Sequence, residues 1–172
     1  MKKTLTALFL TSVSIFALTV GEVPKDITLS DDNGAKVDGT IWQSKMLKDK
    51  VYVFFYVDPD KKDDNEVFLD LLNSKNYDHD QYASVAIINL KATWLPNFAI
   101  EKKLKEKQER FPHTIYAKDK TKYLVSEWDL ADDSFNVLVF DKKGKLIYQH
   151  SGSIEGEELN TIFSIIEDAL VK

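Results

Sequence analysis

Two runs of consecutive apolar residues indicate strands that are buried on both faces. Val51–Val57 reads VYVFFYV and Ser84–Leu90 reads SVAIINL, with no charged side chain in either. Such runs are typical of interior strands in a parallel sheet, because helices cover both sides of that sheet. A shorter run, His113–Ala117, predicts a third strand just after Phe111-Pro112.

Between and after these strands, apolar positions recur at helical spacing. A helix is expected over about residues 63–73, with an apolar side formed by Val67, Leu69, Leu71 and Leu72. Another, rich in Lys and Glu, is expected over about 96–109, with three inward-facing residues, Phe98, Ile100 and Leu104. The clearest pattern predicts the last helix. Steps of three and four residues, which place side chains on one helical face, separate the apolar residues Leu159, Ile162, Phe163, Ile166 and Leu170.

Two hairpins complete the predicted elements. Short β-prone runs at 27–29 and 36–38 flank Asn33-Gly34, a pair of residues that favours a tight turn. Residues 136–140 and 145–150 are joined by a second turn that contains Gly144. The order of strands and helices predicts a single α/β domain over residues 22–172, with a mixed sheet flanked by helices and an N-terminal β-hairpin extension.

The start of the chain predicts a secretory signal peptide over residues 1–19. A basic pair, Lys2-Lys3, precedes the uncharged run Leu5–Leu18, which is shorter than the roughly 20 residues of a membrane span. Small residues favour cleavage after Thr19 or Gly21, and the released domain is expected in the periplasm without stable membrane insertion. The alternative is an uncleaved membrane anchor.

Composition narrows the possible functions. The chain has no cysteine, which excludes disulfide bonds, thiol catalysis and thiolate metal sites. Its 172 residues, 44% of them hydrophobic, are enough for one domain with its own core. The net charge of −5 argues against nucleic acid as a partner, because nucleic-acid-binding proteins need a basic surface.

Several short motifs resemble the YtfJ family of periplasmic thioredoxin-like proteins. The resemblance rests on the predicted signal peptide, on the order of elements and on three patterns: Trp42-x-Ser44-x-x-Leu47-x-x-Lys50-Val51, His79-Asp80-x-Tyr82, and Val137–Val139 followed by Asp141-Lys142-x-Gly144. It implies a thioredoxin-like fold and a secreted protein of unsettled function.

The resemblance also locates the position of the redox centre. In the redox-active members, reactive cysteine lies where the central strand meets the next helix, whose N-terminus stabilises the thiolate. Here the stretch Val57–Asp64 contains no sulfur, and Phe135 stands nearest to the position of the usual cis-proline. A thioredoxin-like protein without redox activity and without a cofactor is therefore expected.

A non-catalytic binding or interaction module is the favoured interpretation. Its surface would combine the loop after the central strand, the loop before the fourth strand and one exposed tryptophan, as Asp58, Asp60, Lys61, Lys62, Trp94, Ser134, Phe135 and Asn136. Phe135 would anchor the partner, unless its ring belongs to the core. The surrounding acids would favour a basic periplasmic protein or peptide.

The alternative is an enzyme that uses carboxylates or histidine on the same frame, for instance in metal-assisted hydrolysis. The weak candidates for metal ligands are Asp78, His79 and Asp80, because imidazole and carboxylate both bind divalent ions. No second histidine lies near in sequence, since His113 and His150 are distant. A loop without ligand function is the simpler interpretation.

Overall fold

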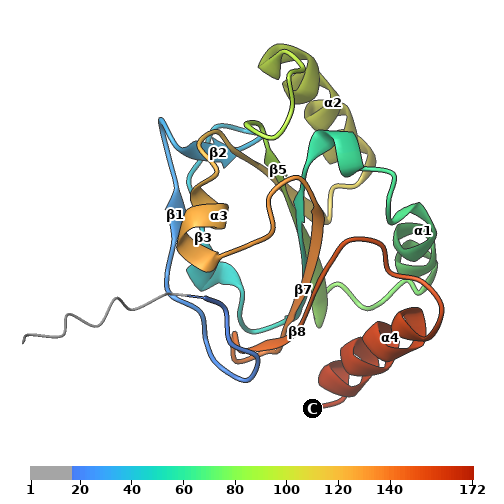
Figure 1. Ribbon diagram of the computed structural model, residues 1–172. Helices are drawn as coiled ribbons and strands as arrows, with labels where there is room; N and C mark the ends of the chain where they lie inside the picture. The colour runs from blue at the N-terminus through green and yellow to red at the C-terminus, as the bar shows by residue number, and fades with distance from the viewer. Residues whose placement is uncertain (1–16) are drawn as a thin grey trace, which may run out of the picture.

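A six-stranded mixed sheet forms the centre of the protein, described by a computed structural model for residues 17–172 (Figure 1). Residues 1–16 of the expected signal peptide lie outside the described residues. In spatial order, the sheet contains β2 (Gly34–Lys36), β6 (Thr114–Asp119), β5 (Tyr82–Asn89), β4 (Val51–Val57), β7 (Phe135–Phe140) and β8 (Leu146–Ser151). β4, β5 and β6 run parallel, whereas β2, β7 and β8 pair antiparallel to their neighbours.

The two faces of the sheet are covered by different elements. One face is covered by three helices, α1 (Glu66–Ser74), α2 (Asn97–Arg110) and α4 (Glu157–Leu170). The other face packs against α3 (Tyr123–Trp128) and a two-stranded sheet of β1 (Thr28–Leu29) and β3 (Trp42–Gln43). Two short 3-10 helices follow strands, η1 (Ser44–Met46) after β3 and η2 (Pro59–Lys61) after β4.

β4 contributes to both hydrophobic layers, which explains its uninterrupted apolar sequence. All seven of its residues are buried. Val53 and Phe55 belong to the layer beneath the three helices, whereas Phe54 and Tyr56 belong to the layer beneath α3. Alternate side chains of a strand point to opposite faces, so a strand covered on both sides needs apolar residues at every position. The predicted central strand and the mixed α/β fold class are confirmed.

The predicted N-terminal hairpin is wrong in its pairing. β1 pairs with β3, through Thr28 with Gln43, and β2 instead joins the edge of the main sheet beside β6. Gly34 starts β2 with φ of 148°, and a Cβ there would lie 2.0 Å from the carbonyl oxygen of Lys118. The glycine therefore allows two backbones to approach, rather than forming a turn between the predicted partners.

Two helical faces also differ from expectation. In α1, Phe68 and Leu72 are buried, whereas Val67 and Leu71 point to solvent. In α2, Ile100 and Leu104 are buried as expected, but Phe98 in the first turn is exposed. Apolar residues outnumber the buried positions on these helices, so composition alone does not identify the inward face. The third predicted strand is also longer than expected, because β6 continues to Asp119.

The chain before β1 lies against the edge of the sheet. The Gly21 N–H donates to the Leu146 carbonyl at 2.7 Å, and the Leu146 N–H donates to the Glu22 carbonyl at 2.9 Å. Leu18 packs against the layer beneath α3. Within residues 17–172, the helices are too short or too polar to cross a bilayer.

Candidate functional site

The loop after β4 lies where the resemblance to thioredoxin-like proteins implies the position of the redox centre. Asp58, the first residue after the strand, is only 3% exposed. Its backbone N–H donates to the Ser134 carbonyl at 3.0 Å, and its carboxylate accepts from the Asp60 N–H at 2.8 Å. Burial raises the pKa of the Asp58 carboxyl, although the Asp60 N–H acts in the opposite direction. Asp58 therefore holds the loop in shape and offers little surface to a partner.

Asp60 joins this loop to the segment that follows β5. The Thr93 hydroxyl donates to the Asp60 carboxylate at 3.1 Å. The next residue, Trp94, is 86% exposed, and Phe98 at the start of α2 is 76% exposed. The structure therefore places the predicted Trp94 beside the predicted Asp60 and adds Phe98, which the sequence analysis had assigned to the core.

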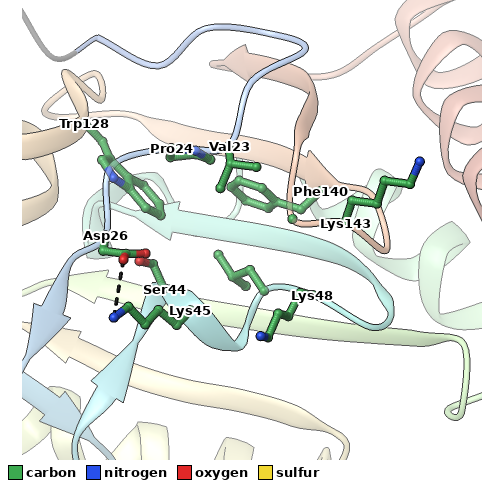
Figure 2. Close-up of a pocket in the computed structure, with 11 residues that line it drawn as sticks. Val23, Pro24, Asp26, Ser44, Lys45, Lys48, Trp128, Phe140 and Lys143 are labelled. Carbon is green, nitrogen blue, oxygen red and sulfur yellow. Dashed lines mark ion pairs between the residues drawn. The ribbon is translucent and has the colours of Figure 1, made fainter.

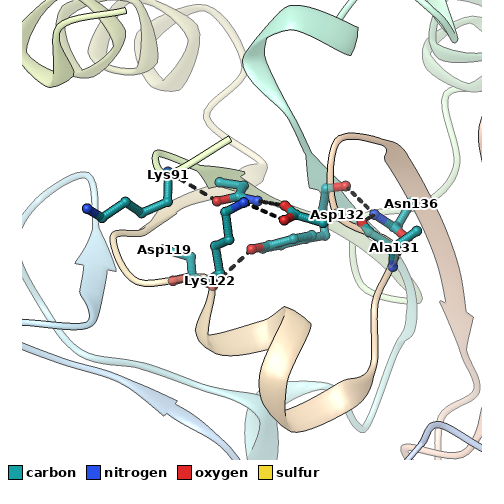
Figure 3. Close-up of polar contacts among 8 residues, drawn as sticks. Lys91, Asp119, Lys122, Ala131, Asp132 and Asn136 are labelled. Atoms are coloured by element: carbon teal, nitrogen blue, oxygen red, sulfur yellow. Dashed lines mark hydrogen bonds and ion pairs between the residues drawn. The ribbon is translucent and has the colours of Figure 1, made fainter. Parts of the chain in front are cut away.

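A layer of polar side chains links the carboxyl ends of the strands (Figure 3). Asn89, buried at the end of β5, donates from its amide to the Asp132 carboxylate at 3.0 Å, and its own oxygen accepts from the Lys91 N–H at 3.1 Å. Lys122 forms an ion pair with the same Asp132. Burial opposes ionisation of Asp132, but the Lys122 ammonium lowers the pKa of its carboxyl overall.

A fully buried carboxylate ends the third parallel strand. Asp119 accepts from the Tyr56 hydroxyl at 3.0 Å and from the backbone N–H groups of Leu124 and Thr121, both at 2.9 Å. Burial, followed by the charge of Asp119, raises the pKa of the Tyr56 hydroxyl. This arrangement fixes the start of α3 to the central strand, which is a structural role.

The loop before β7 contributes structure rather than contacts for a partner. Phe135 is 2% exposed and packs edge-on against Phe55, with ring centroids 5.9 Å apart. Asn136 is 1% exposed and bonded on both sides of its amide. Of the two interpretations of Phe135, the structure therefore shows the core position and not the exposed anchor, because β7 lies between β4 and β8 and directs this ring into the helix-covered layer. Ser134 is half-buried and contributes its carbonyl to Asp58.

The two predicted lysines are solvent-exposed at the start of this edge. Lys61 ends η2, and Lys62 forms an ion pair with its neighbour Asp63. Both side chains are accessible to a partner. Because the chain has no cysteine, the loop that contains Lys61 and Lys62 carries charged groups but no thiol for redox chemistry.

The Asp78-His79-Asp80 cluster lies at the opposite end of the parallel strands from Asp58. These residues precede β5, whereas Asp58 follows β4, and the two strands run parallel with Val51 beside Tyr82. His113 is distant from His79 in sequence, but the fold brings the two side chains together. The rings of His79 and His113 stack with centroids 3.8 Å apart. Both residues precede neighbouring parallel strands, and this shared position was the available signal.

The chemistry of the site follows from these placements. In the described residues 17–172, no three His, Asp or Glu side chains group closely enough to hold a metal ion. The polar residues Asn89, Asp119 and Asp132 were missed from the sequence, although the first two end parallel strands, where open α/β sheets place functional groups. The carboxyl ends of the strands thus form a hydrogen-bonded polar layer with two exposed aromatic rings beside it, Trp94 and Phe98.

Comparisons with known proteins agree with this description. Residues 19–169 match the family described as "Bacterial protein of unknown function (YtfJ_HI0045)". The uncharacterized protein YtfJ of Escherichia coli strain K12 is 23% identical over 133 residues, which are 75% of this chain and 72% of the relative.

Solved structures with a similar fold include thiol proteins. The pneumococcal exposed lipoprotein thioredoxin Etrx1 of Streptococcus pneumoniae strain TIGR4 has a TM-score of 0.57 at 16% identity, covering 84% of this chain and 99% of its own. A thiol-disulfide isomerase from Corynebacterium glutamicum has a TM-score of 0.61 at 14% identity, covering 85% of this chain and 97% of its own. The fold is thus thioredoxin-like, and the chain, which has no cysteine, belongs to the bacterial YtfJ family of unknown function.

Proposed function

We propose that the protein is a secreted periplasmic binding module that holds a segment of another protein beside the former redox position. The observation that carries the proposal is the pair of exposed rings, Trp94 and Phe98, in the segment that is hydrogen-bonded to the loop after β4. Large aromatic side chains dominate binding energy when a partner buries them. Single exposed apolar residues are common on protein surfaces, whereas neighbouring ones mark contact sites, so two large rings within five residues support a contact surface.

The charge around these rings supports a basic segment as the partner. Asp60, Asp64, Glu66 and Asp133 are exposed at this edge and appear in no ion pair among the described residues. The two lysines of the loop offset this negative charge only in part, because Lys62 is already paired with Asp63. Complementary charge mainly accelerates association and makes it sensitive to salt.

The periplasmic location is proposed from the start of the chain. A basic start and a short apolar run are typical of a secretory signal, and cleavage near Thr19 would release the whole domain. A protein that keeps a thioredoxin-like frame without thiols in an oxidising compartment can bind there without undergoing thiol exchange.

The proposal is tested by affinity capture from a periplasmic extract, followed by titration of the purified candidate partner. The wild type is compared with the double variant Trp94→Ala/Phe98→Ala. The control is Val171→Ala, because Val171 is also 86% exposed but lies after α4. We expect the aromatic double variant to weaken binding about tenfold or more and the control to leave it unchanged.

A second variant tests the charge. Asp60→Lys/Asp64→Lys is expected to weaken the same complex, and raising the salt from about 0.05 to about 0.5 M should weaken wild-type binding more than binding of this variant. The proposal fails if the partner binds all variants with equal affinity, provided that circular dichroism shows each variant to be folded.

A further inference from the structure

A hollow of about 300 Å³ lies on the α3 side of the sheet, near the start of β4. It is formed where the chain before β1, the turn containing η1 and the β7–β8 hairpin meet. Its volume is at the lower end of the range for small-molecule sites. The hollow lies at the other end of β4 from the loop containing Asp58, so it is separate from the surface proposed above.

The two sides of this hollow differ in chemistry (Figure 2). One side is apolar, with Val23 and Pro24 at the surface over the buried rings of Trp128 and Phe140. The facing side is a row of polar residues, Asp26, Ser44, Lys45 and Lys48. Such a hollow suits a ligand that has an apolar body and a polar group along one side.

The end of the hollow is shaped by a glycine in the hairpin turn. Gly144 has φ of 79°, and a Cβ there would lie 3.0 Å from the Leu47 carbonyl oxygen. The hairpin therefore closes directly onto the backbone after η1. Ser44, Leu47 and Gly144 all belong to the short motifs on which the family resemblance rests, so these separate motifs meet at one place in the fold.

The charge of the hollow is opposite to that of the chain. Three lysines line it, Lys45, Lys48 and Lys143, against a single acid, Asp26. Asp26 already lies 3.5 Å from the Lys45 ammonium. Lys48 and Lys143 have no ion-pair partner among residues 17–172. In a chain with a net charge of −5, this local excess of positive charge favours an anion.

We propose that this hollow binds a small amphipathic anion, with an apolar body against Val23 and Pro24, over the buried rings of Trp128 and Phe140, and an anionic group near Lys48. Lys143 lines the far end, and in Figure 2 its ammonium extends away from Asp26, so a rotation of this exposed side chain would bring a second cation to the ligand. Carboxylate, phosphate and sulfonate groups share the required chemistry.

The test uses two fluorescent probes that differ in charge. The first, 8-anilinonaphthalene-1-sulfonate, carries an anionic group, and N-phenyl-1-naphthylamine is its uncharged counterpart. We expect the sulfonate to bind the folded wild type at one site and the neutral probe to bind about tenfold more weakly, a difference of about 1.4 kcal/mol. In NMR spectra, the indole N–H of Trp128, which donates to the Lys25 carbonyl at 2.9 Å, should shift on binding, whereas that of Trp94 should not.

Two variants with the same change of charge separate a specific site from general attraction. Lys48→Glu/Lys143→Glu should abolish sulfonate binding, and Lys61→Glu/Lys62→Glu at the opposite edge of the sheet should preserve it. Val23→Trp, at a position 60% exposed, should fill the apolar side and block both probes without unfolding the protein. The proposal is overturned if the two probes bind equally well, if both lysine pairs have the same effect, or if Val23→Trp leaves binding intact.

Discussion

Replacing Asn136 by Asp tests whether this residue acts as a buried structural link between three segments. The Asn136 amide donates to the Tyr56 carbonyl at 3.2 Å and to the Ala131 carbonyl at 2.8 Å. Its oxygen accepts from the Ala131 N–H at 3.0 Å and from the Ser151 hydroxyl at 2.7 Å. Aspartate has nearly the same shape, so Asn136→Asp changes two hydrogen bonds and the charge without opening a cavity.

The magnitude follows from the two carbonyl groups that lose the side-chain donor, of which the Tyr56 carbonyl stays within the pairing of β4 with β7. The lost hydrogen bonds cost about 1–3 kcal/mol, and an ionised carboxylate facing two carbonyl oxygens adds repulsion and desolvation. We expect Asn136→Asp to lower the free energy of unfolding by about 4 kcal/mol at pH 7. This is a large part of the roughly 5–15 kcal/mol by which domains are usually stable.

The loss should depend on pH in a defined direction. Burial next to two carbonyl oxygens raises the pKa of the new carboxyl in the folded state above its unfolded value of about 3.9. The penalty therefore grows as the pH rises through the unfolded value and levels off above the folded pKa. At lower pH the protonated group can donate to one carbonyl, so the loss should fall to about 1–3 kcal/mol.

Urea unfolding measures this difference at several pH values for the variant and the wild type. The fluorescence of the buried Trp42 and Trp128 reports the transition, and an unchanged slope against urea supports the comparison. Asn160→Asp on the exposed side of α4 is the control, with an expected effect below about 0.5 kcal/mol. A loss below about 1 kcal/mol at pH 7, or one that does not change with pH, would refute the structural role of Asn136.

Three further predictions follow from burial and backbone contacts. Asp58→Asn keeps the side-chain oxygen but removes a buried carboxylate whose pKa is raised by burial, so it should increase the melting temperature at pH 7. The gain should disappear below about pH 4, where the wild-type carboxyl is also neutral, and an equal gain at both pH values would contradict this cause. Phe135→Ala should cost about 3–5 kcal/mol in urea unfolding, whereas Trp94→Ala should stay within about 0.5 kcal/mol, and similar values would show that burial is misassigned. Intact mass and N-terminal sequencing of secreted protein should show Val20 or Glu22 as the first residue, and only a start at Val20 keeps the Gly21 N–H bond to β8; an intact N-terminus in a membrane fraction would exclude cleavage.

Features that depend on local pattern and composition could be predicted from the amino-acid sequence. The seven apolar residues of β4 predict a strand covered on both faces, since no other arrangement buries every side chain of an extended segment. The five apolar positions predicted for the inward side of α4 lie on one helical face, because they recur with the period of a helix. The absence of cysteine excludes thiol chemistry whatever the fold.

Contacts between residues that are distant in sequence could not be predicted and became visible in the folded protein. Phe135 and Trp94 are both aromatic residues next to strands, yet one is buried because β7 lies inside the sheet and the other is exposed because it lies beyond the end of β5. His79 and His113 are 34 positions apart and come together because parallel strands align their starting ends. Pairing between strands and the choice of helical face depend on long-range contacts that a local pattern does not encode, and these contacts also create the hollow near Trp128.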